Sequence, residues 1–175
     1  TLTSTFTPGG GTVKVATLTL GKDAGAGAAA RLLPTYNLNG GTLYAASIIG
    51  GGGAFDAASL RTLNLNGGTL RNYDASTDLI IDGTDATAAG LLNVVLASGT
   101  QSIQVDTGRT IALTTRAPIS GAGGLSKLGN GTLVLNGVNT FAASFAVSAG
   151  TLAGNGSVAA ATTISPGATI APGVG

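Results

Sequence analysis

The heptapeptide NLNGGTL occurs twice in this chain, at Asn37–Leu43 and again at Asn64–Leu70. The two copies lie 27 residues apart and are identical at all seven positions, although the residues between them differ. Alternating Asn and Leu precede two glycines, which accept the positive φ of a sharp turn without penalty, and Thr-Leu follows. The stretch therefore predicts a strand, a tight corner and a second strand.

Similar phrases occur along the whole chain. Residues 12–20 read TVKVATLTL and residues 132–135 read TLVL, the alternation typical of strands with one buried face. Residues 105–111 and 164–170 share a frame in which an apolar residue, two small or polar residues and Gly precede a strand. Such phrases recur at irregular intervals of roughly 17 to 30 residues, which indicates a repeat architecture.

The repeat pattern predicts an all-β solenoid. Ankyrin, tetratricopeptide and HEAT arrays need a helical periodicity that is missing, whereas a β-solenoid stacks its coils ~4.8 Å apart. At ~20–25 residues per coil we expect about 7–9 coils, in a rod ~35–45 Å long. The length suits a single β-solenoid domain over residues 1–175.

In such a stack each residue lies above its equivalent in the next coil, so the two NLNGGTL copies predict ladders of like side chains. Asparagine amides would bond to one another and leucines would stack in the core. Gly40-Gly41 over Gly67-Gly68 would keep one corner sharp in both coils. The alternative is a chance recurrence of a favoured phrase. The predicted structural ladder comprises Asn37, Leu38, Asn39, Leu43, Asn64, Leu65, Asn66 and Leu70.

Three segments begin with Asp, a good N-cap, and run through Ala and Leu: Asp23–Leu33, Asp56–Leu63 and Asp85–Leu96. Gly25 and Gly27 would each destabilise a helix by ~1 kcal/mol. We expect these segments to form loops or short helices at the corners.

Composition excludes several functions. The chain contains no Cys, His, Met, Trp or Glu, so Ser-His-Asp triads, Cys-His pairs and His-based zinc sites are absent. Charged residues are 9% of the chain and the net charge is +1. Nucleic-acid binding requires a clustered basic face, and the basic residues here are scattered, so we expect no nucleic-acid partner. No apolar run reaches the ~18 residues of a membrane helix.

Few residues suggest chemistry. Asp74, Asp78, Asp82 and Asp85 form the only acidic group, and with Arg71 or Arg109 they are compatible with a calcium-dependent polysaccharide lyase. The alternative interpretation, which we favour, is a solvated loop with its turn residues. We therefore predict a protein that is not an enzyme, with no catalytic or metal site and no cofactor.

Two further patterns have similar alternatives. Asn130-Gly-Thr and Asn155-Gly-Ser match the N-glycosylation sequon, although Asn-Gly is also turn chemistry. Aromatic residues offer either a sugar-binding stack or, as we favour, core and corner packing. They include Tyr36, Tyr44, Tyr73, Phe55, Phe141 and Phe145.

Residues 121–156 resemble the autotransporter-associated, or passenger-associated, β-strand repeat of Gram-negative secreted proteins. The pattern departs from that family at Ala142–Phe145, where a Thr-Gly-Gly-Thr turn is usual. Its matching motifs are Gly123-Gly124-Leu125, Ser126-Lys127, Gly129-Asn130-Gly131-Thr132-Leu133, Leu135, Gly137, Asn139-Thr140-Phe141 and Ala149-Gly150-Thr151-Leu152.

The resemblance implies a right-handed parallel β-helix that is exported to the bacterial surface or secreted. It implies no reaction, because the repeat is a scaffold element. It also implies an outer-membrane barrel elsewhere in a precursor; the long alternating strands of such a barrel are not found in this sequence.

The two ends of the sequence read as a continuation of one another, since ATIAPGVG joined to TLTSTFTPGG extends the same phrases. We therefore expect one unit of a longer array, or a processed or excised segment. Uncapped β edges invite pairing with another copy, and a non-closing contact makes a filament. The expected end-to-end contact comprises Thr1, Leu2, Thr3, Ile164, Ile170, Pro172 and Val174.

These observations predict an extracellular structural solenoid that stacks on copies of itself into filaments. The alternative is a stalk segment of an autotransporter adhesin, and a third hypothesis is a polysaccharide-binding or polysaccharide-degrading β-helix.

Overall fold

The computed structural model describes residues 2–21, 32–51, 58–84 and 90–173. These residues form β-strands joined by turns and loops, with no helix among them. The described residues accordingly offer no helix that is long and apolar enough to cross a bilayer. The predicted all-β class is confirmed.

The strands of the described residues wind through seven coils, within the range predicted from sequence. The first two coils have two strands each, namely β1 (Leu2–Phe6) and β2 (Thr12–Leu20), then β3 (Leu32–Leu38) and β4 (Thr42–Gly50). The next coils have three strands each: β5 (Arg61–Leu65), β6 (Thr69–Asn72) and β7 (Leu79–Asp82); β8 (Leu92–Leu96), β9 (Thr100–Gln104) and β10 (Thr110–Leu113); β11 (Ile119–Gly121), β12 (Gly124–Leu128) and β13 (Thr132–Leu135). The last two coils are β14 (Val138–Asn139), β15 (Phe145–Val147) and β16 (Thr151–Gly154), then β17 (Ser157–Val158), β18 (Thr162–Ile164) and β19 (Thr169–Pro172).

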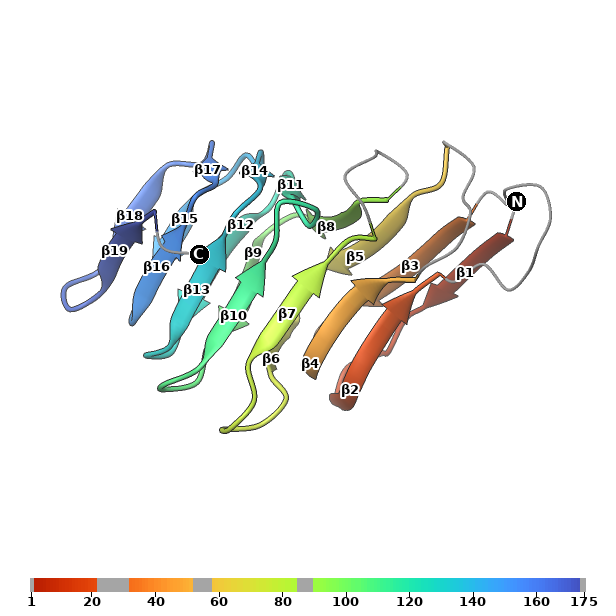
Figure 1. Ribbon diagram of the computed structural model, residues 1–175, viewed down its shortest axis with the longest axis horizontal. Coiled ribbons are helices and arrows are strands. Elements are labelled where there is room, and N and C mark those ends of the chain that lie inside the picture. The colour runs from red at the N-terminus through yellow and green to blue at the C-terminus, as the bar shows by residue number, and fades with distance from the viewer. Residues whose placement is uncertain (1, 22–31, 52–57, 85–89, 174–175) are drawn as a thin grey trace.

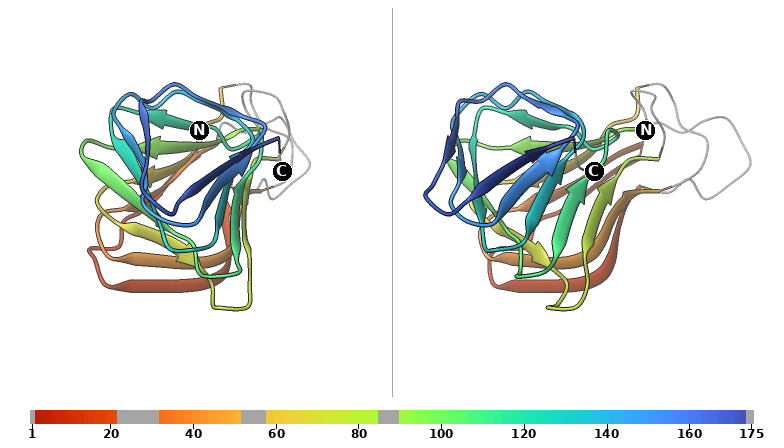
Figure 2. Two further views of the ribbon diagram at one scale, coloured as in Figure 1. Left: turned by 90° about the vertical axis from the view of Figure 1, so that its left-hand side faces the viewer. Right: turned by 60° about the vertical axis from the view of Figure 1, so that its left-hand side comes forward.

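Each described strand pairs in parallel with its equivalent one coil away, so the coils stack along one axis (Figure 1). Viewed toward the end of the stack, the coils lie behind one another around a shared interior (Figure 2). This architecture is a parallel β-helix, as predicted.

The rod has three faces, which we name by their strands. Face A is the sheet β1-β3-β5-β8-β11, beside which the pair β14-β17 continues. Face B contains β6, β9, β12, β15 and β18, and face C contains β7, β10, β13, β16 and β19. Strand β4 bends across the corner, because Thr42–Ala45 pairs with β6 on face B and Ser47–Ile49 pairs with β7 on face C.

The core consists of rows of aliphatic side chains that run along the axis. One row on face B passes through every coil, with aliphatic residues at six positions and one lysine. Its members, in coil order, are Val13, Leu43, Leu70, Ile103, Lys127, Val147 and Ile164. Because strand side chains alternate between faces, this register keeps the same residue class inside in coil after coil.

The two NLNGGTL copies occupy adjacent coils in the same register. Leu38 pairs with Leu65 on face A and Leu43 pairs with Leu70 on face B, and all four leucine side chains are buried. The identical stretches thus form two stacked corners between faces A and B.

The glycines of the two corners are constrained in different ways. The second glycine of the first copy, Gly41, has φ of 69°, and a Cβ there would lie 2.2 Å from the carbonyl oxygen of Gly11. Its equivalent Gly68 lacks a positive φ, but a Cβ there would lie 2.3 Å from Cγ of Leu38. One glycine is required for backbone conformation as well as close approach, and the other for close approach to a core leucine.

Of the three segments predicted to be loops or short corner helices, residues 58–60 and 90–91 are loops and turns, but the other described residues form strands, so the prediction is wrong for these. Residues 32–33 begin β3, residues 61–63 begin β5 and Leu92–Leu96 is β8. Leu92, Val94 and Leu96 alternate and are buried, so stacking on the neighbouring coils overrides their local helix propensity. Residues 23–31, 56–57 and 85–89 lie outside the described residues.

We expect Leu70→Ala to destabilise the rod by about 2–5 kcal/mol, because it opens a cavity in the middle of the face B row. The matched control is Ile80→Ala on face C. Because the Ile80 side chain is 51% exposed, this change should lower the free energy of unfolding by less than about 1 kcal/mol. Urea unfolding followed by circular dichroism measures both. Equal losses for the two variants would contradict the inward register of Leu70.

Candidate functional site

The predicted asparagine residues lie in two short amide ladders beside the corner between faces A and B. Nδ2 of Asn64 donates to Oδ1 of Asn37 at 3.0 Å, and Nδ2 of Asn66 donates to Oδ1 of Asn39 at 3.0 Å. The first ladder extends to the first coil, where Nδ2 of Asn37 donates to Oγ1 of Thr7 at 3.1 Å. Partly exposed amide bonds of this kind each contribute about 0.5–1.5 kcal/mol and hold the coils in register.

In the next coil, a buried glutamine replaces the asparagine ladder at this corner. The Gln101 side chain is 1% exposed, and its Oε1 accepts a hydrogen bond from the backbone N–H of Gly67 at 2.5 Å. Its Nε2 donates to the carbonyl groups of Ala97 and Ser98. Gln101 therefore provides hydrogen-bond partners for backbone groups in two turns, one in the preceding coil and one in its own coil. Sequence reasoning missed this residue, whose only signal is a polar side chain at an inward strand position.

A second buried amide closes the corner between faces B and C. Asn72 is fully buried, and its Nδ2 donates to the carbonyl oxygens of Thr77 at 3.2 Å and Thr110 at 2.9 Å. Its Oδ1 accepts a hydrogen bond from the backbone N–H of Asp106 at 3.1 Å. One side chain thus joins the long β6–β7 loop to the following coil.

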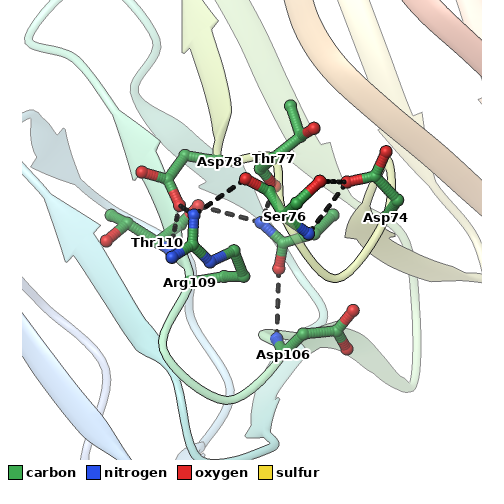
Figure 3. A network of polar contacts seen from close by, with 8 residues as sticks. Asp74, Ser76, Thr77, Asp78, Asp106, Arg109 and Thr110 are labelled. Carbon is green, nitrogen blue, oxygen red and sulfur yellow. Dashed lines mark hydrogen bonds and ion pairs between the residues drawn. The ribbon is translucent and has the colours of Figure 1, made fainter.

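The acidic residues of this loop are engaged by donors from the same corner (Figure 3). Oδ1 of Asp74 accepts hydrogen bonds from the backbone N–H and the hydroxyl of Ser76, at 2.9 and 2.8 Å. Hydrogen bonds from Thr77 and Ser76 lower the pKa of Asp74 to about 2. Asp78 accepts a hydrogen bond from the backbone N–H of Thr110 at 2.9 Å and lies 3.5 Å from Nη1 of Arg109.

Two further ion pairs lie on the outer surface. Nη2 of Arg71 lies 2.6 Å from Oδ1 of Asp106. Arg116 contacts Asp82 through Nε and Nη2. Burial raises the pKa of the Asp82 carboxyl, but hydrogen bonds from Arg116 and Thr114 outweigh it and lower the pKa overall. Arg71 and Arg109, the two arginines considered as catalytic bases, therefore lie against carboxylates, those of Asp106 and Asp78.

The acidic group does not converge on one point. Asp74, Asp78 and Asp82 each have their own partners, and Asp85 lies outside the described residues. Within the described ranges, no three acidic side chains lie close enough together to hold a metal ion. The arrangement ties loops to strands.

The aromatic residues divide between core and surface. Tyr36, Phe141 and Phe145 are buried, and the two phenylalanine rings meet edge to face at 5.8 Å. On the surface, Nζ of Lys14 lies 4.4 Å from the centre of the Tyr73 ring. Cζ of Arg71 lies 5.3 Å from the centre of the Tyr44 ring. Cations thus cover these two surface rings, which a stacked sugar would need free. Phe55 lies outside the described residues.

Lys127 is the exception in the aliphatic face B row. Its side chain is 0% exposed, and Nζ donates to the carbonyl oxygens of Gly129 at 2.7 Å and Ala149 at 2.8 Å. Burial lowers the pKa of Lys127 to about 8. The lysine of the Ser-Lys pair in the sequence motif therefore joins the turns of two successive coils from inside the rod.

Asn139 has the same role beside face A. It is 1% exposed, its Oδ1 accepts a hydrogen bond from the backbone N–H of Ile119 at 3.0 Å, and its Nδ2 donates to the carbonyls of Gly137 and Ser157. These three partners belong to three successive coils. The Asn-Thr-aromatic motif thus marks a buried amide that spans them.

The residues predicted for end-to-end contact lie at opposite ends of the rod. Leu2 and Thr3 belong to β1 in the first coil, whereas Ile164, Ile170 and Pro172 belong to β18 and β19 in the last. Thr1 and Val174 lie outside the described residues.

The last coil bears an apolar hollow of about 140 Å³. It is lined in part by Leu135, Leu152, Val158 and Ile170. The Ile170 side chain is 48% exposed there.

Comparisons with known proteins agree with the sequence motifs. Residues 125–153 match the profile of the family described as passenger-associated-transport-repeat, which confirms the resemblance found within residues 121–156. The chain is also similar to the adhesin BmaC autotransporter of Brucella suis biovar 1 (strain 1330), with 31% identity over 118 residues. That alignment covers 64% of this chain and 3% of the relative, so the chain spans a small part of the relative's length. No solved structure matches the chain significantly.

We expect Lys127→Met to remove a pH dependence of stability. Because the pKa of Lys127 is about 8 in the fold and ordinarily 10.5, the unfolded chain binds more protons between these values, and wild-type stability rises with pH there. The slope should approach about 1.4 kcal/mol per pH unit.

Urea unfolding at several pH values between these two pKa values measures the slope, and Lys14→Met, on the outer surface, is the control that should keep it. An unchanged slope in Lys127→Met would show that Lys127 is not the titrating group.

Proposed function

We propose that this chain is a rigid segment of the stalk of an autotransporter adhesin, in the passenger part exposed outside a Gram-negative bacterium. The observation that carries the proposal is the register of the face B row, which passes without a break through all seven coils of the described residues. The passenger-repeat match and the similarity to an adhesin autotransporter support the same role.

A stack of this kind suits a stalk for mechanical reasons. Each coil adds about 4.8 Å, so seven coils give a rod of roughly 34 Å, and backbone hydrogen bonds run along its axis. Buried amides and Lys127 hold successive corners together, so force along the axis is shared among backbone and side-chain bonds. A stalk segment would need an outer-membrane barrel elsewhere in its precursor.

Catalysis and sugar binding receive less support from the geometry. The described carboxylates of the acidic group are occupied by hydrogen bonds and arginines, and the two surface tyrosine rings are covered by cations. A scaffold needs neither a free carboxylate nor an open ring. The polysaccharide hypothesis is therefore the weakest of the three.

A second candidate function is end-to-end stacking into filaments, which the register at the two end coils favours. The outward row of face B begins at Thr12 and ends at Thr163, and the inward row begins at Val13 and ends at Ile164. A second copy stacked on the last coil would thus place hydroxyl over hydroxyl and aliphatic over aliphatic. Further coils of the same polypeptide could stack on the last coil with the same match of side chains.

For the stalk, we expect beads coated with the purified chain to bind host cells no better than beads coated with albumin, because adhesion would reside elsewhere in the full-length protein. Flow cytometry of cells incubated with fluorescent beads measures this. Saturable binding that Lys14→Ala and Tyr44→Ala abolish would instead identify this segment as a binding module.

For end-to-end stacking, sedimentation velocity over a wide range of protein concentrations should show growing species, and Ile170→Lys at the apolar hollow should prevent them. The matched control is Val138→Lys, since Val138 is 69% exposed on the side of the rod and should leave assembly unchanged. A single monomeric species at every concentration would remove this candidate and leave the stalk proposal intact.

A further inference from the structure

We infer that Asn155 is an acceptor site for an N-linked sugar on the folded chain, and that Asn130 is a second acceptor available only before folding. The donor class is a sugar activated at its anomeric carbon by a diphosphate. Both residues carry the required hydroxyl two positions later, in Asn130-Gly-Thr and Asn155-Gly-Ser. The inference is independent of the stalk proposal.

The hydrogen bonding of the asparagine side chains distinguishes these two positions from the rest. The chain has ten asparagines, all within the described residues, and eight of their side chains take part in hydrogen bonds. Within the part of the chain that the structure describes, the two asparagine side chains without such a bond are those of Asn130 and Asn155. The eight engaged residues are Asn37, Asn39, Asn64, Asn66, Asn72, Asn93, Asn136 and Asn139. The asparagines with free amides are thus the two that belong to sequons.

Exposure distinguishes the two sites. Residues 155–157 are all exposed at the corner of faces C and A, with Asn155 and Gly156 between β16 and β17 and Ser157 at the start of β17. Asn130 is itself exposed, but Gly131 is buried and Thr132 is half-buried in β13, with its backbone N–H bonded to the carbonyl of Arg109 at 2.9 Å. A transferase that must reach both the amide and the hydroxyl can therefore use Asn155 on the folded rod, but Asn130 only on the unfolded chain.

Asn136 is a natural control at the same corner, one coil earlier. It also precedes a glycine, but the residue two positions later is Val138 in place of Ser157. Its Oδ1 accepts a hydrogen bond from the backbone N–H of Asn155 at 3.0 Å. At equivalent corners, Asn136 thus has a hydrogen-bonded side chain and no hydroxyl two positions later, whereas Asn155 has a free amide and the hydroxyl of Ser157.

The transfer balances without an oxidant or reductant. The Asn155 amide nitrogen forms a bond to the anomeric carbon, the bond from that carbon to the diphosphate oxygen breaks, and the diphosphate leaves with the bonding electrons. The amide loses one proton to a base, and the serine hydroxyl is unchanged. The competing reaction at Asn-Gly is attack by the next backbone nitrogen, but Gly156 N–H is bonded to the Leu135 carbonyl at 2.9 Å.

A sugar here would supply polarity where the chain has little. Residues 128–175 contain no Asp, Glu, Lys or Arg, and both sequons lie in this uncharged part. A glycan is bulky and solubilising, and at an exposed corner it projects sideways from the rod. It would hydrate the uncharged coils without entering the core.

The test incubates the folded, purified chain with UDP-glucose and a soluble asparagine glycosyltransferase specific for Asn-x-Ser/Thr, followed by peptide mass spectrometry. We expect one hexose on the peptide containing Asn155 and none on Asn136, and loss of the hexose in Ser157→Ala and Asn155→Gln. Circular dichroism checks that both variants fold. The unfolded chain should gain a second hexose at Asn130.

The same mapping on the protein isolated from the surface of the cells that produce it identifies the donor. A single hexose or a chain built from it indicates a nucleotide-linked donor, and one preassembled oligosaccharide indicates a lipid-linked donor; either result supports the inference. Unmodified or merely deamidated Asn155 in the isolated protein would overturn it. Equal modification of Asn136, or modification that persists in Ser157→Ala, would overturn it as well.

Discussion

In-register parallel hydrogen bonding between successive coils is the constraint on which the rest of this structure depends. Because each described strand pairs with its equivalent one coil away, a side chain in a paired strand lies directly above the side chain at the same position of the coil beneath. Like residues therefore meet like residues: Leu38 packs beside Leu65 in the core, and the Asn37 and Asn64 amides bond outside it. A single register satisfies the backbone, the core and the surface together.

The corners are where this register leaves polar backbone groups inside the rod, and four of the buried polar side chains among the described residues bond to such groups of more than one coil. They are Asn72, Gln101, Lys127 and Asn139, each of which bonds to backbone groups of more than one coil. A buried unpaired carbonyl or N–H costs about 1–3 kcal/mol, so each side chain stabilises its corner and also fixes the order of coils. Three of the four are uncharged amides, which is consistent with a chain that is only 9% charged.

This construction explains why a scaffold is the function that fits best. The described carboxylates considered for chemistry are bonded to loops, strands or arginines, as the Asp74 and Asp78 contacts illustrate. What remains accessible is a stiff rod, its end coils and the exposed corner at Asn155. A stalk, an end-to-end contact and a glycan acceptor all use such features without requiring a reactive pocket.

The order of residues was enough to predict the coil architecture, the approximate coil number and the stacking of one NLNGGTL copy on the other, because repetition and period-two alternation are local signals that solenoid geometry converts into register. The composition alone excluded catalytic and metal sites that depend on His or Cys. Only the tertiary structure decided that Leu92–Leu96 is a strand and that Gln101 and Asn72 face inward to complete turns of neighbouring coils. These outcomes depend on which backbone groups of another coil lie opposite a given residue, and that depends on loop lengths and corner angles, which local sequence patterns do not encode.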